Sequence, residues 1–153
     1  MKRLLATGAF AVLIAGCGHD TGDLESGDLE SPDCPVARYD WSPRDGGMDA
    51  LLEGTLELRD GCLVVKPAWE TQPPDDVVVP VFPRKYSSWD AAREVLTFGG
   101  IEYGMGDYVW VGGGWGPPSE DMDIPTACKP DAYGDVMYVQ DTTAVPYSER
   151  NHN

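Results

Sequence analysis

Histidine is the scarcest residue with catalytic potential in this chain. Only His19 and His152 occur among its 153 residues, one close to each end. A Ser-His-Asp or Cys-His nucleophile needs a histidine inside the folded domain, and a histidine-based zinc site has the same need. The composition therefore argues against both kinds of site, and it predicts a chain that uses no metal and no cofactor.

Basic residues are also few. The chain has 11 Lys and Arg against 26 Asp and Glu, a formal net charge of −15. Such a surface repels nucleic-acid phosphates and anionic lipid headgroups, so no nucleic-acid partner is expected. Basic proteins and cations are the partners that the charge permits. Solubility is the simpler explanation of the same charge.

Long apolar runs are missing as well. Residues 4–15 carry no charge and follow Lys2 and Arg3, but this run is too short for a membrane-spanning helix. A positive start, a short apolar run and a small-residue segment are typical of a secretory signal peptide.

The residues Ile14-Ala15-Gly16-Cys17 resemble the lipobox of bacterial lipoproteins. The resemblance implies cleavage after a signal peptide of residues 1–16 and a diacylglycerol thioether, with fatty acids such as palmitate, on Cys17. The chain would then be exported and held on a membrane through this lipid. Gly18 in place of aspartate favours the outer membrane if the host has two. An ordinary signal peptide with an incidental cysteine is the alternative.

The rest of the chain divides into a tether, a domain and a tail. Residues 17–33 are acidic and contain the pentapeptide Gly-Asp-Leu-Glu-Ser twice in tandem, which predicts an extended low-complexity tether. Residues 34–140 form one small domain. Residues 141–153 are expected to be a disordered tail. Without residues 1–16 the chain keeps 26 acidic and 9 basic residues, a charge of −17.

Alternating residues predict a mainly β domain, a small antiparallel β-barrel or sandwich, with an OB-like barrel possible. Leu52, Leu56 and Leu58 alternate with polar residues, and Asp60-Gly61 supplies a hairpin turn that pairs Leu58 with Leu63. A second hairpin turns at residues 99–100. A single helical turn is expected over residues 87–93.

Three cysteines remain if Cys17 is lipidated, and export permits disulfides. We predict the pair Cys62–Cys128, with Cys62 opposite Arg59 on the outer face of the hairpin, as a clip to the C-terminal segment. Cys34–Cys128 is the alternative pairing. The remaining Cys34 is expected to stay a buried or idle thiol, because Cys34-Pro35 is not a thiol-oxidoreductase motif.

Aromatic residues give the best candidate for a contact site. Tyr108 and Trp110 share one face of a predicted strand, and Trp115 follows in a glycine-rich stretch, residues 112–116, that reads as a flexible loop. If Val109 and Val111 face the core, these rings can stack on a glycan or on an apolar patch of an envelope protein. The predicted contact region is then the loop of residues 112–123 together with Tyr108 and Trp110. The alternative is that Tyr108 and Trp110 are core residues themselves.

Acidic residues cluster in the next segment, at Glu120, Asp121 and Asp123. Oxygen ligands at this spacing can bind calcium, and paired carboxylates can serve a glycosidase. The missing helix-loop-helix ligand pattern favours a solvated acidic loop.

The domain as a whole resembles the small uncharacterised domains of actinobacterial-type lipoproteins. The resemblance rests on Gly61-Cys62-Leu63-Val64, on Val79-Pro80-Val81-Phe82-Pro83, and on Gly106-Asp107 leading to residues 112–114. It implies no activity. The sequence thus predicts a non-enzymatic structural or binding module of the cell envelope. The alternatives are an inhibitor of a basic envelope-attacking enzyme such as lysozyme and a small carboxylate-dependent hydrolase.

Overall fold

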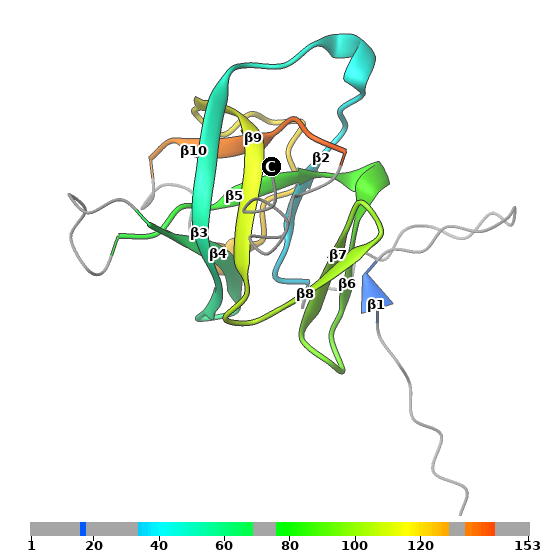
Figure 1. The fold of residues 1–153 in the computed structure, drawn as a ribbon, viewed down its shortest axis with the longest axis vertical. Coiled ribbons are helices and arrows are strands. Elements are labelled where there is room, and N and C mark those ends of the chain that lie inside the picture. The colour runs from blue at the N-terminus through cyan, green and yellow to red at the C-terminus, as the bar shows by residue number, and fades with distance from the viewer. Residues whose placement is uncertain (1–15, 18–33, 69–75, 129–133, 143–153) are drawn as a thin grey trace, which may run out of the picture.

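Two β-sheets and no α-helix make up the part of the chain described by the computed structural model, residues 16–17, 34–68, 76–128 and 134–142 (Figure 1). No helix in these ranges has the length and apolar character needed to cross a membrane. The strands are β1 (Gly16–Cys17), β2 (Ala37–Tyr39), β3 (Ala50–Arg59), β4 (Cys62–Pro67), β5 (Pro80–Pro83), β6 (Ser87–Asp90), β7 (Val95–Phe98), β8 (Ile101–Gly104), β9 (Tyr108–Gly116) and β10 (Val136–Val139). Three short 3-10 helices, η1 (Pro43–Asp45), η2 (Arg84–Tyr86) and η3 (Thr126–Cys128), join them.

The larger sheet has six strands in the order β2-β5-β10-β9-β3-β4. β5 runs parallel to both β2 and β10, and the other neighbours are antiparallel, so the sheet is mixed rather than antiparallel as predicted. It does not close into a barrel. Among the described residues, the edge strand β4 meets the segments that precede β2 and β5 through isolated backbone bonds, from Leu63 N to Pro35 O at 2.9 Å and between Val65 and Val78. The arrangement is sandwich-like, and the barrel and OB-like forms of the prediction are wrong.

The smaller sheet has the order β1-β6-β7-β8. The β7–β8 hairpin has the predicted register, with Leu96 opposite Tyr103. The helical turn expected over residues 87–93 is wrong, because this segment begins with strand β6. Asp90 Oδ1 accepts hydrogen bonds from the amides of Ala92 and Arg93, at 3.0 and 3.2 Å. This is the chemistry of a helix cap, used here to close a turn between two strands.

The β3–β4 hairpin follows the sequence prediction. Leu58 lies opposite Leu63, and Arg59 opposite Cys62. The turn residues Asp60 and Gly61 have φ values of 51° and 84°. Two successive left-handed residues form the tight turn whose twist matches that of the strands, so local chemistry sets this register.

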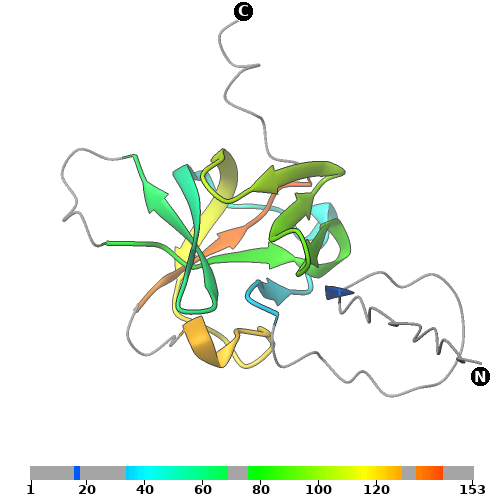
Figure 2. The ribbon, with the colours of Figure 1, turned by 90° about the horizontal axis from the view of Figure 1, so that it is seen from below.

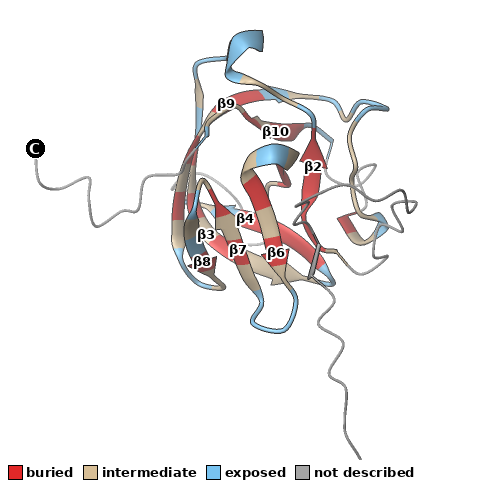
Figure 3. Ribbon diagram, turned by 90° about the vertical axis from the view of Figure 1, so that its right-hand side faces the viewer, coloured by how far each residue is buried: buried red, intermediate tan, exposed pale blue. Residues whose placement is uncertain are grey.

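The main hydrophobic core lies between the two sheets, because its members come from strands of both. Figure 3 shows buried residues along the strands and exposed residues in the connecting turns. Phe82 of the larger sheet meets Phe98 of the smaller one edge to face, with ring centroids 5.2 Å apart. The buried members are Val36, Leu52, Leu56, Leu63, Val65, Phe82, Trp89, Leu96, Phe98, Tyr103, Val109, Val111, Met137 and Val139.

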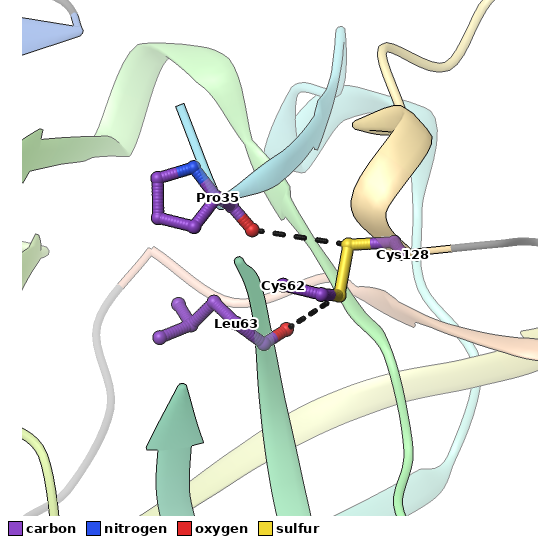
Figure 4. The surroundings of a disulfide bond; sticks show 4 residues. All are labelled: Pro35, Cys62, Leu63 and Cys128. Carbon is purple, nitrogen blue, oxygen red and sulfur yellow. Dashed lines mark hydrogen bonds between the residues drawn. A yellow bond between two sulfur atoms is a disulfide. The ribbon is translucent and has the colours of Figure 1, made fainter. Parts of the chain in front are cut away.

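A second buried cluster contains the Cys62–Cys128 disulfide that the sequence predicts (Figure 4). Both cysteines are completely buried, and their sulfur atoms lie 3.6 and 3.8 Å from the carbonyl oxygens of Leu63 and Pro35. Cys62 lies opposite Arg59 on the outer face of the hairpin, as predicted, but this face is buried in the second cluster. The bond shares this cluster with Val64 of the same strand and with residues of other strands, whose positions the sequence pattern does not predict: Ala37, Tyr39, Val79, Val81 and Val136.

Cys34 also differs from expectation. It is disulfide-bonded rather than an idle thiol, and its partner lies outside the described side chains. Because Cys128 is joined to Cys62, the alternative pairing of Cys34 with Cys128 is excluded. Figure 2 shows η3, which carries Cys128, on the far side of the molecule from the β7–β8 hairpin.

Tyr39 of the second cluster makes stability sensitive to alkaline pH. Its hydroxyl donates to Val139 O at 2.9 Å, and burial raises the pKa of Tyr39 from 10.0 to about 12, against a smaller lowering by the Gln140 side chain. The unfolded chain therefore releases this proton at a lower pH than the folded one. We expect the free energy of unfolding to fall between pH 10 and 12, and the ionisation of Tyr39 to cause no change in it below pH 10.

Urea unfolding at pH 8 and at pH 11.5 measures this effect. Tyr39→Phe should cost about 1 kcal/mol at pH 8 through the lost hydrogen bond and should flatten the alkaline decline, whereas Tyr138→Phe should leave the decline in place. An unchanged slope in Tyr39→Phe would show that other groups cause it.

Candidate functional site

The outer side of β9 begins with two aromatic residues. Val109 and Val111 are buried in the main core, at 2% and 0% exposure, so the alternation of the strand places Tyr108 and Trp110 on its opposite side. Both rings are partly buried there. They are not members of the main core. Because the two valines face the core, the two aromatic residues lie on the outer side of the strand, as the sequence analysis required for a contact site.

Strand β3 lies beside β9 and completes this surface (Figure 1). The register places Glu53 opposite Trp110 and Thr55 opposite Tyr108. Leu51, opposite Gly112, is 40% exposed. We call the surface formed by Leu51, Glu53, Thr55, Tyr108 and Trp110 the β3–β9 face.

The glycine-rich stretch is part of strand β9, not the flexible loop expected from the sequence. Its glycines let other segments come close to the strand. A Cβ on Gly113 would lie 1.8 Å from Tyr138 O, and one on Gly114 would lie 2.0 Å from Met48 Cε. The amide of Gly112 donates to Asp141 Oδ2 at 2.6 Å. Close packing thus requires glycine, which has no side chain, at these positions.

Trp115 is separate from the other two aromatic residues. It is 38% exposed and lies opposite buried Met137, and the alternation of β9 gives it the side of Val109 and Val111. The structure therefore does not bring Trp115 into one site with Tyr108 and Trp110. The predicted contact region of residues 112–123 divides into the end of a strand and a separate acidic segment.

The three acidic residues proposed for calcium do not share a site. Glu120 is exposed, and Asp121 accepts a hydrogen bond from the Ser119 hydroxyl, which lowers the pKa of Asp121. Asp123 points elsewhere, toward two arginines. Among the described residues, no group of three or more His, Cys, Asp or Glu is arranged to hold a metal ion.

Asp123 belongs to a charged cluster at the edge strand β2. Its Oδ2 lies 3.4 Å from Arg38 Nη2 and 3.5 Å from Arg84 Nη1, and Arg84 Nε lies 3.5 Å from Asp40. Arg38 is 7% exposed. The backbones of Arg38 and Asp123 also exchange two hydrogen bonds, at 2.9 and 2.8 Å. This ion pair explains why Asp123 is held, and it gives the residue a structural role in place of the proposed ligand role.

Comparisons of the chain with protein-family models, with curated proteins and with solved structures find no match in any of the three. Function must therefore be argued from the site itself. The β3–β9 face is the surface on which described aromatic, acidic and apolar side chains meet.

Sequence reasoning found the aromatic half of this face and missed the rest. Glu53 belongs to a clear alternating strand, but nothing local indicates that β3 pairs with β9. Met48 lies against Gly114 of β9. The run of glycines was the available signal for this, because consecutive small residues in a strand indicate close approach of other segments. His19 and His152 lie outside the described residues.

Proposed function

We propose that this chain is an exported, lipid-anchored, non-enzymatic module of the cell envelope that binds a partner through the β3–β9 face. The proposal rests on the difference between the two sides of strand β9. One side of the strand supplies Val109 and Val111 to the core, while the other side carries Tyr108 and Trp110, with Glu53 opposite Trp110 on the neighbouring strand. Aromatic rings next to a charged group on an outer surface are typical of binding sites.

Two observations support export. The N-terminal residues have the pattern of a secretory signal. The domain contains a completely buried disulfide between Cys62 and Cys128, and disulfides form and persist in oxidising compartments outside the cytoplasm.

The lipid anchor rests on the resemblance of residues 14–17 to the lipobox. Two or three acyl chains on Cys17 would hold the protein stably on a membrane, the outer one if the host has two. A thioether uses the sulfur of Cys17, so a lipidated Cys17 cannot also form a disulfide. Because Cys34 is disulfide-bonded in the structure, the decisive measurement is whether the sulfur of Cys17 carries a lipid or takes part in a disulfide.

We expect Cys17→Ala to abolish incorporation of labelled palmitate and to move the protein from the membrane fraction to the soluble fraction, because the lipid is its only proposed anchor. Radiolabelling and membrane fractionation of cells measure both effects. Cys34→Ala, which leaves the lipobox intact, is the matched control and should keep label and membrane association.

Mass spectrometry of the mature protein provides the opposing outcome. A first residue Cys17 with attached acyl groups supports the anchor. Recovery of Cys17 in a disulfide-linked peptide with Cys34, with no acyl group on the protein, would refute it while leaving the binding face untouched.

Inhibition of a basic envelope-attacking enzyme is the second candidate function. The net charge of −15 favours it, since charge complementarity accelerates and orients association with a basic enzyme. Loss of lysozyme turnover in the presence of the full chain at moderate salt would support this role. Binding without any loss of turnover would exclude it. The hydrolase hypothesis is not retained, because Glu120, Asp121 and Asp123 have separate surroundings.

A further inference from the structure

We infer that Met48 is a site of reversible oxidation by a peroxide, and that its sulfoxide releases the exposed segment of residues 43–49 from strand β9. The inference goes beyond the proposed function, because it uses neither the β3–β9 face nor the lipid anchor. It rests on an exposed thioether, on the glycine that this thioether covers, and on one hydrogen bond that ties the segment to the sheet.

The segment leads from η1 into β3 and lies at one end of the larger sheet (Figure 1). Every residue from 43 to 49 is exposed, as the colouring of η1 in Figure 3 also shows. The Trp41 indole donates to Gly46 O at 2.9 Å and closes the turn on itself. The amide of Met48 donates to Gln140 Oε1 at 2.7 Å. Met48 is therefore where the exposed turn is joined to the sheet.

The side chain of Met48 occupies the space that a side chain at position 114 would fill. A Cβ on Gly114 would lie 2.0 Å from Met48 Cε and 2.4 Å from its sulfur. Gly114 is buried, whereas Met48 is 49% exposed. The thioether thus has the backbone of β9 on one side and solvent on the other, so a small oxidant reaches this residue without any opening of the fold.

The other described methionines are less accessible. Met137 is completely buried in the main core, while Met105 and Met122 are partly buried against the two clusters. Exposure governs which methionine is oxidised first. In the reaction, a sulfur lone pair attacks one oxygen of hydrogen peroxide and the O–O bond breaks. The attacked oxygen stays on the sulfur, and the other oxygen leaves as hydroxide and takes up the remaining proton to form water.

Oxidation changes the contact with β9, because it converts an apolar thioether into a polar group. A polar oxygen must keep its hydrogen bonds to water, and the close contact with Gly114 leaves no room for water between sulfur and strand. The sulfoxide therefore turns toward solvent. The bond from Met48 N to Gln140 Oε1 is itself exposed to water, and one such bond holds a segment weakly.

The test follows amide hydrogen exchange of residues 43–49 in the full chain, in detergent micelles, before and after mild treatment with hydrogen peroxide. In peptide maps we expect Met48 to be oxidised at least about tenfold faster than Met137. Exchange of the Met48 amide should become about tenfold faster once the sulfoxide has formed. A methionine sulfoxide reductase should restore the slow exchange.

Three variants separate the sulfur of Met48 from general oxidation. Met48→Leu keeps an apolar side chain, so exchange should stay slow and peroxide should not change it. Met48→Gln places a polar side chain against Gly114 and should exchange as fast as the oxidised chain. Met105→Leu removes a partly buried methionine elsewhere and should leave the response of the segment intact. Unfolding curves for each variant confirm that the fold is retained.

Equal oxidation rates for Met48 and Met137 would overturn the site. A sulfoxide at Met48 that leaves exchange of residues 43–49 unchanged would overturn the release, and so would a peroxide response that persists in Met48→Leu. None of these outcomes involves palmitate or a partner, so failure here is distinct from failure of the anchor or of the binding face.

Discussion

Replacing Cys62 and Cys128 together by alanine is expected to lower the free energy of unfolding by about 4 kcal/mol. The bond joins β4 to η3 across 66 sequence positions, so its removal frees a long loop in the unfolded chain. Both residues are completely buried, and the change also removes sulfur atoms from a packed cluster. A loss of this size is a large fraction of the stability of a small domain.

Urea unfolding with and without a reductant measures the effect. Reductant should also destabilise the natural chain, because it breaks the Cys62–Cys128 bond and the disulfide of Cys34 while leaving the sulfur atoms in the cluster. Reductant added to the double variant then reports the contribution of the disulfide formed by Cys34 alone. A double variant within 1 kcal/mol of the natural chain would show that the segment bearing Cys128 is held by packing and not by the bond.

Gly54→Ala is expected to destabilise the domain by about 3 kcal/mol or to prevent folding. Gly54 lies in β3 between β4 and β9, opposite Pro67 on one side and Val109 on the other. A Cβ at this position would lie 2.1 Å from Lys66 O and 2.9 Å from Pro67 Cα. Backbone atoms cannot move aside as a flexible side chain can, so the two strands would have to separate locally.

Gly104→Ala is the matched control for this substitution. Gly104 also lies in a strand, but its nearest atom to an added Cβ is Asp107 Oδ2 at 3.7 Å, an ordinary contact. Thermal unfolding should show a change within about 0.5 kcal/mol for Gly104→Ala. Similar losses for both substitutions would mean that lost flexibility in the strands matters more than the steric conflict at Gly54.

The hairpins could be predicted from the sequence because their causes are local. The turn at residues 60–61 and the alternation of Leu56 and Leu58 determine the β3–β4 register within a few residues. The order of the larger sheet has no such local cause. The parallel pairing of β5 with β2 and β10 joins segments far apart in the chain. A continuous apolar stretch such as β5 gives no indication of which strands will pair with it.

The candidate site also combines features with local causes, which the sequence predicts, and features that depend on long-range pairing. Alternation along residues 108–111 separates the core valines from the outer aromatic residues and needs no knowledge of the partners. The position of Glu53 depends on β3 lying against β9, and the ion pair of Asp123 with Arg38 joins residues 85 positions apart. Side chains of opposite charge occur throughout this sequence, so no pattern selects the two that meet.

The attachment of Asp123 to Arg38 has a consequence for self-association. An edge strand with free amides and carbonyls can add a strand from another molecule, and such additions propagate into aggregates. Two backbone bonds and an ion pair place the Asp123 segment along the outer edge of β2, which blocks addition of a foreign strand there. The proposed lipid anchor would crowd such molecules in two dimensions on a bilayer, where aligned edges collide often. A blocked edge would keep neighbouring copies separate and leave their binding faces accessible.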